Sequence, residues 1–347
     1  MTKKRLEYID AMRGFTMIFV VFNHIAWFAF QNESMAYNDV LSQFRMPLFF
    51  FISGWVFYKA ERIWNKSMVA EVLKKKFMVQ IIPFLVFMLL FLYVNDMLDV
   101  TSLGSNKKGY WFTFVLFEFF ALYVFAVSLF QPKADGSRGD WPVFLFALTV
   151  SCASFYYYGY YGRYVLELGH INDVAGLISF TKIRYFIFFW LGTFVRKYFD
   201  RFIEWTNNQY VMAGVLVLFV LMVIFPQVFS IMGLEFIMFV LIGVFGIAIV
   251  FTFFRTKENY FKKSCLEGRI LQYIGRRTLD IYLLHYFFLP HDLTSLGQFF
   301  GVYDNKFVGL VVGVGISILL IAVCLFVSEV IRLSPFLGHY LFGAKRS

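Results

Sequence analysis

The chain has 347 residues, of which 60% are hydrophobic, 22% aromatic and 16% charged, with a formal net charge of +10. A soluble domain carries roughly 45–50% apolar and about 25% charged residues, so this composition excludes an ordinary soluble protein. Apolar runs of about 20 residues are long enough to cross about 30 Å of hydrocarbon as helices. We therefore predict an all-α polytopic membrane protein, and we interpret the positive charge as a topology signal, with no nucleic-acid partner expected.

Ten transmembrane helices are predicted, and residues 1–347 are expected to form a single membrane domain because no loop is long enough for a separate soluble one. In chain order the spans are 8–30, 43–59, 77–95, 110–130, 141–159, 183–198, 209–226, 231–254, 277–300 and 307–331. The first span lacks a small-residue cleavage site, which indicates a retained helix. The ninth is the least regular, because Pro290 and a His-Asp pair interrupt it.

The distribution of basic residues predicts the topology. The two termini and alternate loops hold 24 of the 32 Lys and Arg residues, whereas the opposite loops hold seven. Cytoplasmic loops carry the excess of Lys and Arg, so both termini are predicted to be cytoplasmic. Residues 31–42, 96–109, 160–182 and 301–306 are then expected to face outward. The three cysteines are widely spaced and the five histidines form no metal-type pair, so no metal site is expected.

The first span contains ionisable residues, which normally face a protein interior or water when they lie within a membrane. Arg13 and His24 are eleven residues apart, which is about 20° past three helical turns, so they share one face about 16 Å apart. Asp10 lies on the same stripe. This spacing suits a long ligand with phosphates at one end and a reactive group at the other, such as coenzyme A. The alternative is that Arg13 extends to the inner surface and His24 is a core histidine.

Three further helices carry polar residues. Ser53 of helix 2 is a candidate for ligand binding, and the alternative is that Ser53 and Gly54 permit close helix contact. Glu118 of helix 4 is isolated among aromatic residues at a depth near that of His24, and a buried carboxylate needs a partner. His24 is one candidate partner, and another helix or a tyrosine hydroxyl is the alternative. Tyr282 and His285 of helix 9 are predicted to lie within the membrane, for binding or for packing.

These segments together resemble the acyltransferase-3 family of integral-membrane acyltransferases, in particular its fucose 4-O-acetylase-like branch. The matching stretches are "IDAMRG…NH" in helix 1, "MPLFFFISG" in helix 2, "WFTFVLFEFFALY" in helix 4 and "TLDIYLLH" in helix 9. The resemblance implies acyl transfer from a cytosolic acyl-CoA to a hydroxyl of an envelope glycan or lipid-linked sugar, in the inner membrane of a bacterium. It also implies that Arg13 and His24 are needed for activity. Relatives often have histidine where this chain has Arg45, so a role for Arg45 in binding the acceptor is open.

Acyl transfer to an alcohol needs a base for the hydroxyl proton and donors for the oxyanion. We expect His24 to be the base, Glu118 to orient it, and Arg13 to hold coenzyme A phosphates together with cytoplasmic lysines. An acyl-histidine intermediate remains an alternative to direct transfer.

The co-substrate is expected to be acetyl-CoA or another acyl-CoA, such as succinyl-CoA, with no tightly bound cofactor. The partners would be the acceptor and membrane lipid, and the oligomeric state is open. The rival hypothesis is a transporter of a small anion or sugar that uses Arg13, His24 and Glu118.

Overall fold

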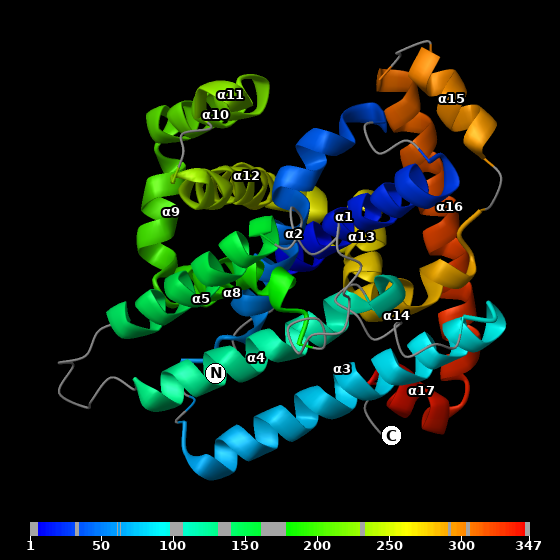
Figure 1. Cartoon of the computed structure of the whole chain (residues 1–347), viewed down its shortest axis with the longest axis horizontal. Helices are drawn as coiled ribbons and strands as arrows, with labels where there is room; N and C mark the ends of the chain where they lie inside the picture. The colour runs from blue at the N-terminus through cyan, green and yellow to red at the C-terminus, as the bar shows by residue number, and fades with distance from the viewer. Residues whose placement is uncertain are drawn as a thin grey trace. The chain divides into compact units, whose positions relative to one another are not determined.

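The computed structural model describes residues 6–31, 35–60, 62, 64–97, 107–130, 140–160, 178–229, 233–290, 293–302 and 306–343, and within these the regular secondary structure is helical. The prediction of an all-α membrane protein is confirmed. With no water in the bilayer core, a helix satisfies each backbone group within its own segment, so long apolar runs fold in this way. The chain forms two compact units (Figure 1), each built from discontinuous parts of the sequence.

Unit 1 comprises residues 1–52 and 199–333. It contains the first fifteen residues of α2 (Asn38–Phe57) and the following elements: α1 (Glu7–His24), the π-helix η1 (Ile25–Ala29), the 3₁₀ helix η2 (Met35–Tyr37), α9 (Phe199–Asn207), α10 (Gln209–Ile224), α11 (Pro226–Phe229), α12 (Glu235–Thr256), the 3₁₀ helix η7 (Glu258–Phe261), α13 (Leu266–Arg276), α14 (Thr278–Leu284), the 3₁₀ helix η8 (His285–Phe287), α15 (Thr294–Val302) and α16 (Lys306–Arg332).

Helix α1 is the centre of unit 1, since it packs against α13, α16, α12 and α14. Two glycines allow α13 to lie directly on α1. A Cβ atom at Gly275 would come within 1.9 Å of the Asp10 carbonyl oxygen, and one at Gly14 within 2.0 Å of the Leu271 carbonyl oxygen. The backbones of the two helices are therefore in contact, as at helix interfaces built from small residues.

Unit 2 comprises residues 53–198 and 334–347. Its elements are the end of α2, α3 (Lys66–Val94), the 3₁₀ helix η4 (Lys107–Gly109), α4 (Trp111–Leu129), α5 (Trp141–Tyr160), the 3₁₀ helix η6 (Phe180–Tyr185), α8 (Phe186–Lys197) and α17 (Pro335–Phe342). Its core is aromatic, with rings from Phe57, Phe119, Phe120, Phe186 and Phe189 in mutual contact. The C-terminal α17 lies against α3 (Figure 1).

Seven helices among the described residues are long and apolar enough to cross a membrane. They are Glu7–Ala29 (α1 with η1), α2, α3, α4, α5, α12 and α16, and the pair α9 and α10, bent by 82°, would make an eighth. The structure differs from the predicted spans in two places. Residues 183–198 form only the end of η6 and the twelve-residue α8, and residues 277–300 are divided among α14, η8 and α15. The total of ten spans and the cytoplasmic termini remain predictions, as does the single domain.

Candidate active site

Two histidines from distant parts of the sequence meet in unit 1. His24 ends α1 and His285 begins η8, and Nδ1 of His24 lies 2.7 Å from Nε2 of His285. The two ring planes are nearly parallel, at 12°. His285 is completely buried, whereas His24 keeps partial exposure. The pair therefore has one member, His285, that is enclosed by the protein, and a second, His24, that is less deeply buried.

The hydrogen bonds of the pair assign its protons. Nδ1 of His285 lies 2.8 Å from the Tyr282 carbonyl oxygen and 3.1 Å from that of Ile281. A carbonyl only accepts, so Nδ1 of His285 carries the proton and Nε2 of a neutral ring is the acceptor. His24 must then donate through Nδ1, which leaves its Nε2 unprotonated. The arrangement holds His24 in the tautomer that a general base requires.

Tyr286 also reaches His24 and was missed by the sequence analysis. Its hydroxyl lies 3.3 Å from Nε2 of His24, long for an O–H···N bond, and it is the group that faces the basic nitrogen. The residue stood next to His285 in the sequence, but neighbouring residues of a regular helix point about 100° apart. Here α14 ends and the 3₁₀ turn η8 begins at His285, and both His285 and Tyr286 contact the His24 ring.

A second change of winding follows His24. The α-helix ends at this residue and five residues of π-helix, Ile25–Ala29, continue the span. Single π turns inside helices are uncommon and are frequent at functional sites. Both helices that supply a histidine thus depart from regular α geometry at that histidine, which marks the pair as a candidate site independently of its residue types.

Arg13 lies on the same continuous α-helix as His24, toward the N-terminal end of the span, as the residue spacing predicted. Its Nη2 donates to the hydroxyl of Thr278, the first residue of α14, at 2.9 Å. Asp10 is buried, with a carboxylate oxygen 3.9 Å from Nε of Arg276. The stripe predicted on α1 therefore faces α13 and α14, inside unit 1.

Arg45 is buried in α2 and belongs to a polar cluster beside the histidines. It donates to the amide oxygen of Asn38 at 3.1 Å, and Asn38 donates to the amide oxygen of Asn23, also at 3.1 Å. Asn23 precedes His24, and the charge of Arg45 acts electrostatically on His24. Asn23 had appeared in the matching "NH" stretch, but nothing in the sequence connected it with Asn38.

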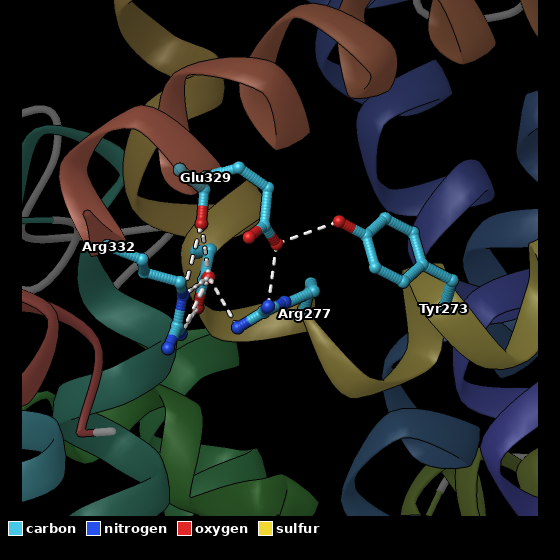
Figure 2. A network of polar contacts seen from close by, with 6 residues as sticks. Tyr273, Arg277, Glu329 and Arg332 are labelled. Carbon is cyan, nitrogen blue, oxygen red and sulfur yellow. Dashed lines mark hydrogen bonds and ion pairs between the residues drawn. The ribbon is translucent and has the colours of Figure 1, made fainter. Parts of the chain in front are cut away.

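A network of charged groups attaches α14 to α16 (Figure 2). Asp280, 2% exposed, accepts two hydrogen bonds from Nη2 of Arg332, at 3.0 and 2.8 Å, and one from the Ser328 hydroxyl at 2.5 Å. Nearby, Glu329 accepts from Arg277 at 2.6 Å and from the Tyr273 hydroxyl at 2.8 Å. Charge-assisted bonds of this kind fix orientation as well as add energy, so α14, which leads directly into His285, is firmly placed.

The other two predicted site residues, Ser53 and Glu118, lie in unit 2. Next to Ser53, a Cβ atom at Gly54 would come within 2.0 Å of the Phe189 carbonyl oxygen, so this segment does make a close helix contact. Glu118 has one buried carboxylate oxygen, Oε2, for which the described residues supply no hydrogen bond. Its pairing with His24 remains a prediction.

Lys107 is the charged group that acts on Glu118 within unit 2. It is 3% exposed, donates to the Ser179 hydroxyl at 2.7 Å and lies 4.3 Å from the centre of the Phe114 ring. Burial lowers the pKa of Lys107 to about 8, against the opposing attraction of Glu118. The carboxylate and the lysine thus share a poorly solvated part of unit 2, where each affects the charge of the other.

The chain belongs to the acyltransferase-3 family: residues 6–328, nearly its whole length, match the family's acyltransferase domain. With the helices described above, this defines a multi-pass membrane acyltransferase and favours the predicted enzyme over the predicted transporter. No curated protein and no solved structure shows a significant match to the chain. The fucose 4-O-acetylase-like branch remains a prediction.

Proposed function

We propose that the protein is an O-acyltransferase that uses His24 as its general base. The donor would be a cytosolic acyl-CoA, acetyl-CoA in the simplest case, and the acceptor a hydroxyl of an envelope glycan or lipid-linked sugar at the inner membrane of a bacterium. The observation that carries this proposal is the His24–His285 pair. It leaves Nε2 of His24 unprotonated, with the Tyr286 hydroxyl facing that nitrogen, whereas a histidine that serves only packing needs no fixed tautomer.

In the proposed reaction the acceptor hydroxyl replaces Tyr286 as the donor to Nε2 of His24. The base removes the hydroxyl proton while the oxygen attacks the thioester carbonyl, and a tetrahedral intermediate forms. Collapse of this intermediate breaks the C–S bond, and the imidazolium returns its proton to the departing thiolate of coenzyme A. His285 accepts from Nδ1–H of His24 throughout, so it orients the base as the acid does in a catalytic triad.

Arg13 is proposed to bind the donor. It lies on the same helix as His24, and about 16 Å separates the two along the axis, comparable to the pantetheine arm of coenzyme A. A guanidinium binds phosphate through two parallel N–H groups. Glu118, Ser53, Arg45, Tyr282 and Asp10 remain proposed contributors to catalysis or binding, and among them only Asp10, Arg45 and Tyr282 belong to the unit that holds the histidines.

The proposal is tested on the purified full chain and in cells. His24→Ala should reduce acyl transfer by about 10²- to 10⁴-fold, the usual value of general base catalysis, while acyl-CoA binding and thermal stability remain. Mass spectrometry of envelope glycans from a deletion strain and its complement should show an acyl ester that depends on the protein and so identify the acceptor. Near-normal transfer by a folded His24→Ala variant would contradict the role of His24.

A further inference from the structure

An open groove of about 580 Å³ lies in unit 1 between α13 and α16, the yellow and orange helices of Figure 1. Its floor is apolar and is formed by Ile270, Ile274, Ile318, Ile321 and Leu325. Ile270 is 49% exposed and Ile318 is 46% exposed, so the described residues leave this part of the floor uncovered, whereas Ile274 and Ile321 are buried beneath it. None of these side chains takes part in the proposed acyl transfer.

The exposed face of α13 continues this apolar surface. Leu266, Ile270 and Tyr273 follow one another at spacings of four and three residues, and all three are exposed. The opposite face carries Gly268 and Gly275, which are buried, and Gly275 lies on α1. One face of α13 therefore packs against the protein, and the opposite face exposes apolar side chains beside the candidate membrane span α16.

Three basic residues line the groove: Lys263, Arg269 and Arg276. Arg276 is engaged with the backbone and side-chain oxygens of Gln272. The side chains of Lys263 and Arg269 are exposed, and the described residues give neither of them an ion pair or hydrogen bond. All three belong to segment 255–277, the most basic loop of the predicted cytoplasmic side, with seven Lys and Arg residues.

We propose that this groove binds a phospholipid with an anionic headgroup, with an acyl chain on the isoleucine floor and the phosphate on Lys263 and Arg269. Residues 318–325 cover about 10 Å of α16, which fits within the roughly 15 Å of hydrocarbon in one leaflet. The cytoplasmic leaflet is the one that attracts basic segments, and basic pockets between membrane helices bind anionic headgroups. A soluble anion would use the two cations but not the apolar floor.

The test measures how phosphatidylglycerol changes the thermal stability of the purified full chain in detergent, with phosphatidylcholine as the comparison lipid. Phosphatidylglycerol should raise the melting temperature more at equal concentration. Lys263→Gln with Arg269→Gln should weaken its apparent affinity by about 30-fold, because each cation near an anionic headgroup is worth about 1 kcal/mol. The matched control is Lys257→Gln with Lys262→Gln, which removes two charges from the same loop outside the groove and should leave the affinity unchanged. Ala322→Phe, which fills the groove wall, should weaken both lipids.

Three results would overturn the proposal. Equal stabilisation by the two lipids would make the groove an ordinary lipid-facing surface. Equal stabilisation by glycerol phosphate would reduce it to a soluble-anion site. Competition by acyl-CoA for phosphatidylglycerol, lost in the Lys263 and Arg269 double variant, would assign the groove to the donor instead. Acyl transfer is measured on the same samples, so failure of the lipid site and failure of the proposed reaction are separate outcomes.

Discussion

Nδ1 of His24 and Nε2 of His285 lie 2.7 Å apart although 261 positions separate the two residues in the chain. The contact converts two histidines into one directional unit, in which a buried ring with a fixed proton determines which nitrogen of the outer ring is basic. It also connects the first predicted span with the segment that precedes the last one. The proposed chemistry requires the hydrogen bond between the two rings, because this bond leaves Nε2 of His24 free to accept a proton.

Replacement of His285 should separate its orienting role from simple packing. His285→Gln places an amide oxygen near the position of Nε2, so it still accepts from His24 and should retain more transfer than His285→Leu, which offers no acceptor. We expect His285→Leu to lower kcat by about 10²-fold or more, within the range of general base catalysis, with the KM for the donor little changed. Equal activity of folded Gln and Leu variants would contradict the orienting role.

Arg13→Lys should mainly weaken binding of the acyl donor. A lysine keeps the charge but loses the planar fork that binds phosphate through two N–H groups. The variant should therefore need more acyl-CoA and regain most of its transfer at saturating donor. Thr278→Val is the matched control, because it removes the hydroxyl that accepts from Arg13 without changing the charge. Loss of transfer at saturating donor, with unchanged donor affinity, would contradict this role.

Gly275→Ala should destabilise the protein strongly. The added methyl group would come within 1.9 Å of the Asp10 carbonyl oxygen, so α13 and α1 would have to move apart. Overpacking of this kind typically costs about 1–3 kcal/mol and more when backbone atoms obstruct. Gly315→Ala in α16 is the control, since no atom lies within 4 Å of the new methyl group, and helix propensity should make it neutral or slightly stabilising. Thermal unfolding in detergent compares them, and equal melting temperatures would refute the close contact.

The stability of unit 2 should depend on pH through Lys107. Its pKa is about 8 in the folded protein and 10.5 ordinarily, so between these values the unfolded chain binds more protons. The contribution of Lys107 to the free energy of unfolding therefore becomes more favourable to the folded state as the pH rises from about 8 to about 10.5. The melting temperature of the wild type relative to Lys107→Met should increase from pH 7.5 to pH 9.5. Lys306→Met, which removes an exposed lysine, should show no comparable trend. A constant difference between wild type and Lys107→Met would contradict the shifted pKa.

Cysteine accessibility in spheroplasts tests the predicted topology. In a background without native cysteines, single cysteines at Lys66 and Lys262 should resist membrane-impermeant reagents, whereas a cysteine at Lys306 should react. The expectation rests on the 24-to-7 distribution of basic residues between the two sides. Strong external labelling at position 66 or 262 would contradict the predicted topology. The proposed donor site could then not face the cytosol.

The sequence predicted whatever depends on local pattern. Apolar length identified most of the membrane helices, and helical periodicity placed Arg13 and His24 on one face of α1. Periodicity says which face a residue occupies but not which helix it meets, so the pairing of His24 with His285 and that of Arg13 with Thr278 were missed. The contact of Tyr286 with His24 was missed for the same reason, since it too joins residues of two distant segments. The division of segment 277–300 had a visible signal in Pro290.

The order of synthesis follows from the arrangement of unit 1. Its two parts flank residues 53–198, so a growing chain inserts its first span and then most of unit 2 before the partners of α1 exist. His285, the partner of His24, is synthesised 261 residues after it. Ser328 and Arg332, which hold Asp280 of α14, are synthesised later still. A nascent chain that stops before residue 328 would contain both histidines but would lack Ser328 and Arg332, the hydrogen-bond donors to Asp280. The proposed site therefore acquires its last supporting contact only after Arg332 has been synthesised, and until Thr278 follows, α1 must remain stable in the bilayer without that partner of Arg13.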